Sequence, residues 1–321
     1  MIFEKKVIEE YEKQFLVRYD DTGLVHYFTA ADFPGLSSEP FSFVGDRGQR
    51  LRGNIYYYND KSTERLVIFE HGMGGGHLAY MKEIEALARR GFTVLSYDHT
   101  GCMASEGENI GGFSQSLADL DYCIRAVRET PGLENIGLSV VGHSWGAFST
   151  LNISAIHTDI THIAAMSGFV SVKSMLRGFF PGILGLYVPA IYKREKQRLP
   201  EYAEFDAIES LKKSNAHALI IHSDDDAVCS FKRHFAKMEK ALSKRQKIIF
   251  AHATKKGHNP NFTERAVKIK DAFFADLTKK TKEGYFTDEV KKSEFKASYD
   301  FDKMSEQDEM FWDGVAGFLK F

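Results

Sequence analysis

Cysteine is scarce in this chain of 321 residues, and neither sign of charge dominates. Cys102, Cys123 and Cys229 are an odd number at wide spacing, without a Cys-x-x-Cys pair. This pattern argues against a disulfide framework or a structural zinc site, and it favours a reducing cytoplasm. Lys and Arg number 42 against 44 Asp and Glu, for a formal net charge of −2. We therefore expect no chain-wide surface for nucleic acid.

Long apolar runs are also missing. No stretch reaches the ~18 apolar residues that a membrane-spanning helix needs, and the longest, 178–192, is interrupted by Pro181, Pro189 and three glycines. The first residues, MIFEKKVIEEYEKQ, contain no apolar core of a signal peptide. Hydrophobic residues make up 43% and charged residues 27% of the chain, as in ordinary globular proteins. We expect a soluble, cytoplasmic protein without stable membrane insertion.

Short apolar runs alternate with amphipathic helical stretches along most of the chain. Apolar runs without polar alternation are typical of strands buried on both faces, as in a parallel sheet. The alternation predicts an α/β fold with a doubly wound sheet. The expected strands are 66–69, 92–97, 136–141, 162–166, 218–222 and 247–251. The expected helices include 78–87, 117–127, 231–242, 262–273 and a final one near 310–319, with Ser116 and Asp119 as a capping box.

Four segments lie outside this alternation. Residues 15–28 and 41–58 each carry a turn signal between two apolar stretches, which predicts two β-hairpins. Residues 168–205 begin apolar and end charged. Residues 278–308 alternate in charge sign, which predicts a solvated excursion rather than a binding tail.

The most informative motif is Gly142-His143-Ser144-Trp145-Gly146. It follows an apolar strand directly and precedes helix-compatible sequence, which is the context of a nucleophile elbow. The serine of such an elbow sits on a strained turn so that its hydroxyl projects above the sheet, and small flanking residues let the backbone pass closely. The alternative is a glycine-rich turn without a catalytic role.

This motif, together with the glycine-rich loop His71–Gly76 after strand 66–69, resembles the α/β-hydrolase superfamily of serine hydrolases. The resemblance covers about residues 41–321. It implies the α/β-hydrolase fold, a mostly parallel central sheet flanked by helices, with a helical cap insertion. By analogy with the family, the backbone amides of Met73 and Trp145 would form the oxyanion hole.

The resemblance also implies a catalytic triad in the order serine, acid, histidine. Ser144 would be the nucleophile, activated by a histidine that the acid orients. Asp226, after strand 218–222, occupies the family's acid position, and Asp225 is the second choice. His258 lies in a Gly-His pair after the last core strand, as the family's catalytic histidine does, and His252 is its rival.

Other chemistries fit the sequence less well. The glycines of 72–76 lack the spacing of a dinucleotide fingerprint, and no phosphate loop is present, so Asp98-x-x-Gly101 is interpreted as a turn after a strand. Cys229 is interpreted as a small buried residue. No cofactor is expected. No metal is expected either, because the histidines lack metal-ligand spacing. Those considered are His71, His77, His143, His222 and His252.

The surplus of residues between nucleophile and acid lies at about 168–205, where the family commonly inserts a cap. Its first half is apolar and aromatic, and either lines a pocket for an acyl or aromatic group or packs the cap onto the core. Glu195, Glu201 and Glu204 are interpreted as a solvated helix face, with binding of a substrate ammonium as the alternative. The candidate substrate-binding residues are Phe169, Phe179, Phe180, Leu184 and Tyr187.

We therefore expect a serine hydrolase that cleaves a small-molecule carboxylic ester, with a hydrophobic acyl or aromatic group, through an acyl-enzyme. Among α/β hydrolases it resembles the carboxylesterase and monoacylglycerol-lipase-like, serine aminopeptidase-type branch. The alternatives are an aminopeptidase or C–C bond hydrolase on the same triad, or a catalytically silent binding protein. One domain is expected over residues 1–321, with an N-terminal extension 1–40, a cap at about 168–205 and a late insertion at about 278–308. The sequence does not fix the oligomeric state.

Overall fold

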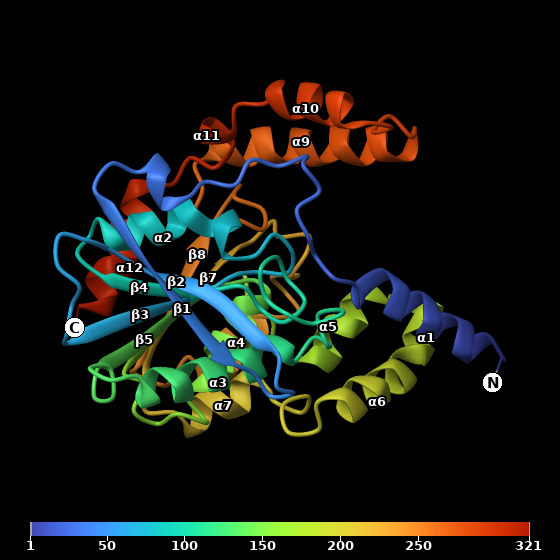
Figure 1. Cartoon of the computed structure of the whole chain (residues 1–321). Helices are drawn as coiled ribbons and strands as arrows, with labels where there is room; N and C mark the ends of the chain where they lie inside the picture. Colours follow the sequence, from blue (N-terminus) through green and yellow to red (C-terminus); the bar gives the residue numbers. More distant parts are fainter. Residues whose placement is uncertain (1, 321) are drawn as a thin grey trace.

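An eight-stranded sheet forms the centre of the computed structural model, which describes residues 2–320 (Figure 1). The strand order is β1-β2-β4-β3-β5-β6-β7-β8. Neighbouring strands from β4 to β8 in this order are parallel, whereas β2 runs antiparallel to both of its neighbours. The strands are β1 Leu36–Val44, β2 Arg50–Tyr58, β3 Arg65–Glu70, β4 Thr93–Tyr97, β5 Gly137–His143, β6 His162–Met166, β7 His217–Ser223 and β8 Ile248–Ala253.

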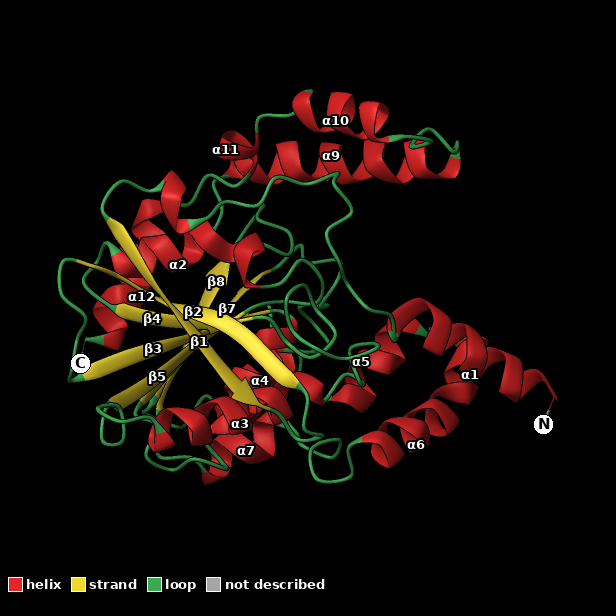
Figure 2. Cartoon of the chain, viewed as in Figure 1, coloured by secondary structure: helices red, strands yellow, loops and turns green. Residues whose placement is uncertain are grey.

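Helices cover both faces of the sheet (Figure 2). On one face α3, α4, α7 and α8 pack on strand residues such as Val140, and on the other α2 and α12 pack on residues such as Val141. None of the helices in residues 2–320 combines the length and apolarity that crossing a membrane requires. The α-helices are α1 Ile2–Phe15, α2 Met81–Ala88, α3 Gln115–Glu129, α4 Trp145–Ile153, α5 Val172–Phe179, α6 Val188–Arg198, α7 Ala207–Lys213, α8 Phe235–Leu242, α9 Glu264–Lys282, α10 Glu289–Ala297, α11 Phe301–Met304 and α12 Glu309–Leu319. The 3₁₀ helices are η1 Ala30–Asp32, η2 His77–Tyr80 and η3 Gly182–Tyr187.

The predicted α/β architecture is confirmed. Each of the six apolar runs forms a strand of the parallel part of the sheet, and the predicted hairpin at 41–58 forms β1 and β2. Every residue of β4 and β6 is buried, which explains why these strands read as continuous apolar runs rather than alternating ones.

The hairpin predicted at residues 15–28 is wrong. No strand forms there, and the one ladder contact of the segment is an isolated bridge between Tyr19 and Cys102. A side chain holds the segment instead: the Arg18 guanidinium donates to the carbonyl oxygens of Met103, Ser105 and Gly107 at 2.6 to 2.9 Å. Hydrogen bonds from the Arg18 side chain therefore hold this segment in place of the backbone hydrogen bonds of a strand pair.

The capping box predicted for Ser116 and Asp119 is also wrong. Helix α3 begins at Gln115, two residues before the predicted start at 117, so the Ser116 and Asp119 side chains both lie inside the helix. The Asp119 carboxylate is fully buried and accepts hydrogen bonds from the Thr100 amide and hydroxyl at 2.8 Å. It therefore fixes the turn after β4 rather than the start of its own helix.

Most side chains of the stretch 278–308 are exposed, as its charges predicted, but the stretch folds into helices that pack on the protein. Its first residues complete α9, and α10 and α11 follow, forming a separate group of helices (Figure 1). Phe295, Phe301 and Met304 are buried in a cluster around Phe273 of α9. A few apolar positions within a charged sequence are enough to fold these helices onto the protein.

Candidate active site

A strained turn at Ser144 joins β5 to α4. Ser144 has φ +55° and ψ −111°, a left-handed conformation that side-chain-bearing residues rarely adopt. Its amide donates to the Met166 carbonyl oxygen at 2.8 Å. A Cβ on Gly142 would lie 2.4 Å from the Gly146 carbonyl oxygen, and one on Gly146 would lie 2.2 Å from the Glu70 carbonyl oxygen. Both glycines of the motif are therefore required by the close packing of the turn.

Three side chains from separate strand ends form a hydrogen-bonded chain at this turn. Ser144 follows β5, Asp226 follows β7 and His258 follows β8, so the parallel sheet brings them to one edge. His258 Nε2 lies 2.8 Å from Ser144 Oγ, and His258 Nδ1 lies 2.8 Å from Asp226 Oδ2. The Asp226 side chain is fully buried and that of His258 is 18% exposed. The three residues predicted as a triad thus lie together in the expected order.

The Asp226 carboxylate is held as an anion. Oδ1 accepts hydrogen bonds from the amides of Val228 and Cys229 at 2.8 and 2.9 Å, and Oδ2 faces His222 and His258. Burial alone would raise the pKa of this carboxyl, but the hydrogen bonds and charges of the two histidines hold the pKa well below its ordinary value. An ionised Asp226 can fix His258 with its proton on Nδ1.

The runners-up for acid and base lie outside this chain of hydrogen bonds. The Asp225 carboxylate accepts from the Ser223 hydroxyl and from the Gly257 amide, the latter at 3.0 Å. It thereby supports the loop before His258, and within residues 2–320 the hydrogen bonds of the His258 imidazole go to Asp226 and Ser144. His252 is exposed and pairs with Glu239 at 2.9 Å.

His143 carries a role that sequence reasoning missed. Its Nε2 lies 2.7 Å from the carbonyl oxygen of His258, which can only accept, so Nε2 carries the proton and donates. Nδ1 must then accept from the Tyr80 hydroxyl, 2.9 Å away. Burial, and next the nearby His258 ring, lower the pKa of His143 well below its ordinary value, so the ring is neutral at pH 7. The only signal in the sequence was its place beside the serine of the motif.

His222 is a second histidine that contacts Asp226. Its Nε2 lies 2.6 Å from the Cys229 carbonyl oxygen and 3.1 Å from Asp226 Oδ2. Because the carbonyl oxygen only accepts, Nε2 carries a proton that both oxygens share. The buried Nδ1 has no hydrogen-bond partner within residues 2–320. A position at the end of β7, four residues before Asp226, was the available signal.

The glycine-rich loop after β3 packs directly on the elbow. A Cβ on Gly72 would lie 3.3 Å from Ser144 Cβ and 2.5 Å from the Tyr80 hydroxyl oxygen. The next turn needs glycine as well, because Gly74, Gly75 and Gly76 have φ of +84°, +68° and +61°. Met73, predicted as one oxyanion donor, lies within this loop. Trp145, predicted as the other, is the first residue of α4, so its amide has no acceptor within the helix.

Two histidines considered as metal ligands fix the neighbouring loops instead. His71 Nε2 accepts from the His99 amide at 3.0 Å, so its Nδ1 donates to the Gly72 carbonyl oxygen at 2.6 Å. The His77 amide and ring both contact Asp98 Oδ1, at 2.8 and 2.6 Å. Asp98 follows β4, as the turn interpretation expected.

The candidate substrate-binding residues separate into packed and exposed positions. Phe169 stacks on Phe148 of α4 with ring centroids 4.7 Å apart. Phe179 stacks on Phe15 of α1 at 4.9 Å, and Phe180 lies against Tyr11 of the same helix at 6.3 Å. The remaining two differ: Leu184 is 42% exposed and Tyr187 is partly buried against the core. Helix α1 therefore packs over α5 and α6 (Figure 1).

Glu195 is not part of a solvated face, and that prediction is wrong. Its carboxylate is fully buried and accepts from the Tyr11 hydroxyl at 2.8 Å and the Phe113 amide at 2.7 Å. The reason is that α1 covers this side of α6, a contact that the sequence of α6 alone does not reveal. Glu201 and Glu204 are exposed, as predicted.

Comparison with known proteins finds hydrolases and esterases among the similar sequences. The family model described as serine aminopeptidase, S33, matches residues 61–204. Esterase YjfP of Escherichia coli is 28% identical over a match covering 50% of this chain and 68% of that protein. The putative carbamate hydrolase RutD of Azorhizobium caulinodans is 28% identical over 39% of this chain and 45% of its own length.

A solved structure supports the fold independently. The esterase Pf2001 of Pyrococcus furiosus superposes with a TM-score of 0.59 at 15% identity, covering 84% of this chain and 96% of that one. The chain has the α/β-hydrolase fold. Its family-model match and its esterase-like relatives make it similar to the serine hydrolases of that superfamily, which supports a hydrolase of the α/β-hydrolase type.

Proposed function

We propose that this hydrolase cleaves a carboxylic ester through an acyl-enzyme on Ser144. The observation that carries the proposal is the continuous chain from Ser144 Oγ through both nitrogens of His258 to Asp226, with both links at 2.8 Å. A serine hydroxyl is a weak nucleophile until a positioned base removes its proton, and the base needs an acid to fix its tautomer. These three residues meet both needs.

In the first half-reaction the Ser144 oxygen attacks the ester carbonyl carbon while His258 Nε2 takes the hydroxyl proton. The ionised Asp226 stabilises the imidazolium that forms. The tetrahedral intermediate then collapses, the bond to the alcohol oxygen breaks, and His258 returns the proton to the leaving alcohol. In the second half-reaction a water molecule, deprotonated by His258, attacks the acyl-enzyme and releases the acid.

The amides of Met73 and Trp145 are proposed to stabilise the oxyanion. Support comes from the loop at Gly72, which packs on Ser144, and from the position of Trp145 at the start of α4. A helix start presents unpaired N–H groups and the positive end of the helix dipole. Two such donors aimed at the developing charge are what acyl transfer requires.

A hydrophobic acyl or aromatic group is the proposed substrate moiety. The apolar cap segment supports this through Phe169, Phe179, Phe180, Leu184 and Tyr187, which we propose as the residues nearest to it. Peptide hydrolysis is the second candidate because the matched family model carries the name of an aminopeptidase. A carboxylate for the substrate's amino group is harder to find, since Glu195 already accepts from Tyr11 and Phe113.

Purified protein assayed with p-nitrophenyl esters of graded acyl length and with aminoacyl-nitroanilides separates these candidates. We expect turnover of the esters and a loss of about 10⁴-fold or more in Ser144→Ala. Faster turnover of the nitroanilides would establish the peptidase instead. Equal turnover by Ser144→Ala would reject the mechanism.

A further inference from the structure

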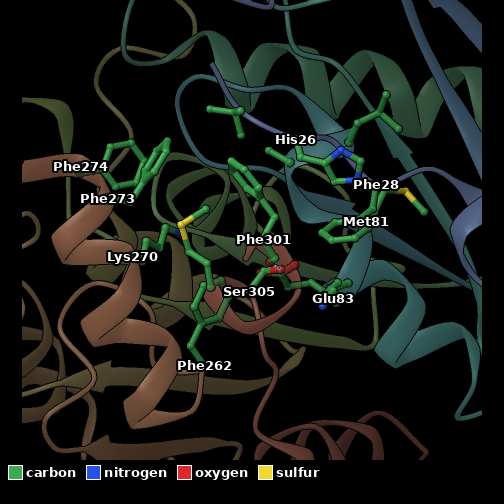
Figure 3. A pocket seen from close by; sticks show the side chains of 15 residues that line it. His26, Phe28, Met81, Glu83, Phe262, Lys270, Phe273, Phe274, Phe301 and Ser305 are labelled. Carbon is green, nitrogen blue, oxygen red and sulfur yellow. Dashed lines mark hydrogen bonds between the residues drawn. The ribbon is translucent and has the colours of Figure 1, made fainter. Parts of the chain in front are cut away.

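A cavity of about 120 Å³ lies apart from Ser144, Asp226 and His258, none of which lines it. It forms where α2, α9, α11 and the segment before β1 meet (Figure 3). Aromatic side chains from all sides form its walls, with Phe273 and Phe274 opposite Phe28 in the view of Figure 3. Met81 and Met304 complete an apolar lining. Cavities lined this way accept apolar groups readily.

The lining also contains an ammonium with unused hydrogen-bond donors. Lys270 Nζ donates to Asn259 Oδ1 at 2.9 Å and lies 4.5 Å from the centre of the Phe262 ring. Among residues 2–320 no carboxylate lies within 4.0 Å of it. An ammonium has three donors, so Lys270 retains capacity for an anionic partner. Burial lowers the pKa of Lys270, and the negative charges of Glu83 and Asp271 oppose that shift.

The other charged groups of the cavity are already engaged. Lys82 pairs with Asp302 at 2.7 Å. The buried Glu83 carboxyl accepts from the Asn261 amide at 3.0 Å. Burial raises the pKa of Glu83, while the charge of Lys270 opposes that shift. The part of the Glu83 population that is protonated does not repel an incoming anion. The lining therefore suits a ligand that carries one anionic group on an apolar body.

We propose that this cavity binds a compact apolar carboxylate, with its carboxylate on Lys270 and its apolar body between Phe273, Phe274 and Phe301. The size fits: an engineered apolar cavity of about 150 Å³ accommodates benzene, so one aromatic ring or a short acyl chain fills this one. The site is separate from ester hydrolysis and does not depend on it. The Lys270 ammonium also donates to Asn259, which directly follows His258 in the chain.

The test uses the full chain carrying Ser144→Ala, so that turnover plays no part. Binding of 4-fluorobenzoate and of 4-fluorobenzamide, which has the same shape without the charge, is measured by ¹⁹F NMR titration. We expect saturable binding of the benzoate and at least about tenfold weaker binding of the benzamide. Lys270→Met should weaken benzoate binding about tenfold or more, whereas Lys268→Met, exposed on the same helix, should leave it unchanged.

A second variant guards against misfolding of Lys270→Met. Phe274 is 48% exposed at the rim. Phe274→Asp adds a charge of the same sign as the benzoate without removing Lys270, so it should also weaken benzoate binding about tenfold or more. Equal affinity for benzoate and benzamide would overturn the proposal. Benzoate binding that survives in both Lys270→Met and Phe274→Asp would place the probe elsewhere and overturn it too.

Discussion

Replacing Tyr80 by phenylalanine tests the hydrogen bonds that fix the backbone of His258. The Tyr80 hydroxyl donates to His143 Nδ1 at 2.9 Å, and His143 Nε2 donates to the His258 carbonyl oxygen at 2.7 Å. The same hydroxyl lies against Gly72 of the glycine-rich loop. One hydroxyl therefore ties together the loop, the elbow and the residue proposed as general base.

The size of the effect follows from what the missing hydroxyl leaves behind. His143 Nδ1 is buried, and a buried acceptor without a donor costs about 1–3 kcal/mol. We expect Tyr80→Phe to lower the free energy of unfolding by about that amount. The proposed base would lose part of its support, and because a shift of ~1 Å can cost ~10²-fold in rate, we expect kcat to fall roughly tenfold with little change in KM.

The assay is steady-state hydrolysis of a p-nitrophenyl ester together with urea unfolding. Tyr58→Phe is the matched control, because it removes a hydroxyl that contacts Glu85 at 3.2 Å outside the site. His143→Gln keeps a side-chain N–H for the His258 carbonyl and should retain more activity than His143→Ala. An unchanged kcat in Tyr80→Phe, or an equal fall in Tyr58→Phe, would refute the reasoning.

Three further predictions concern the acid, the elbow and the pH dependence of stability. Asp226→Asn should lower kcat by about 10⁴-fold in a steady-state assay. Asp225→Asn should lower kcat by less than about tenfold, because Asp225 supports only the loop before His258. Comparable losses in the two variants would contradict the assignment of Asp226 as the acid. Gly146→Ala should destabilise the fold, because the added Cβ would lie 2.2 Å from the Glu70 carbonyl oxygen. Gly314→Ala has open space around the added Cβ and should stabilise α12 by about 0.5–1 kcal/mol. Urea unfolding measures both changes in the free energy of unfolding. Burial lowers the pKa of His234 to about 3, below its unfolded value of about 6.5. The unfolded state therefore binds the extra proton, and this group's contribution to stability falls as pH drops from about 6.5 towards 3, by up to ~1.4 kcal/mol per pH unit. His234→Asn should flatten the pH dependence of unfolding, and an unaltered slope would contradict this origin.

The inner strands of the sheet were predictable because they are buried on both faces. Every residue of 93–97 and 162–166 is buried, and the few polar residues there, Thr93, Ser96 and His162, do not produce an alternating pattern. The outer segments were not predictable in the same way. Residues 15–28 are held by the Arg18 side chain on distant carbonyls, and 283–308 fold through a few apolar residues amid charges. Both depend on tertiary contacts that local patterning does not contain.

The candidate site shows the same division. Ser144, Asp226 and His258 were predictable because each follows a strand in a fixed order, and a parallel sheet brings strand ends together. His143 and His222 were missed because their roles consist of contacts to backbone carbonyls and to another side chain, which carry no sequence spacing. The burial of Glu195 depends on its contact with Tyr11 of α1, 184 residues away in the chain, and the sequence around Glu195 gives no sign of that contact.

The most direct test of the central claim is to identify the residue that becomes acylated. The protein is treated with a fluorophosphonate probe or, at short reaction times, with a p-nitrophenyl ester, and digested for peptide mass mapping. We predict a single adduct on Ser144, formed slowly or not at all in His258→Ala and absent from Ser144→Ala. Hydrolysis that proceeds without an adduct on Ser144, or an adduct on another residue that supports turnover, would contradict the account.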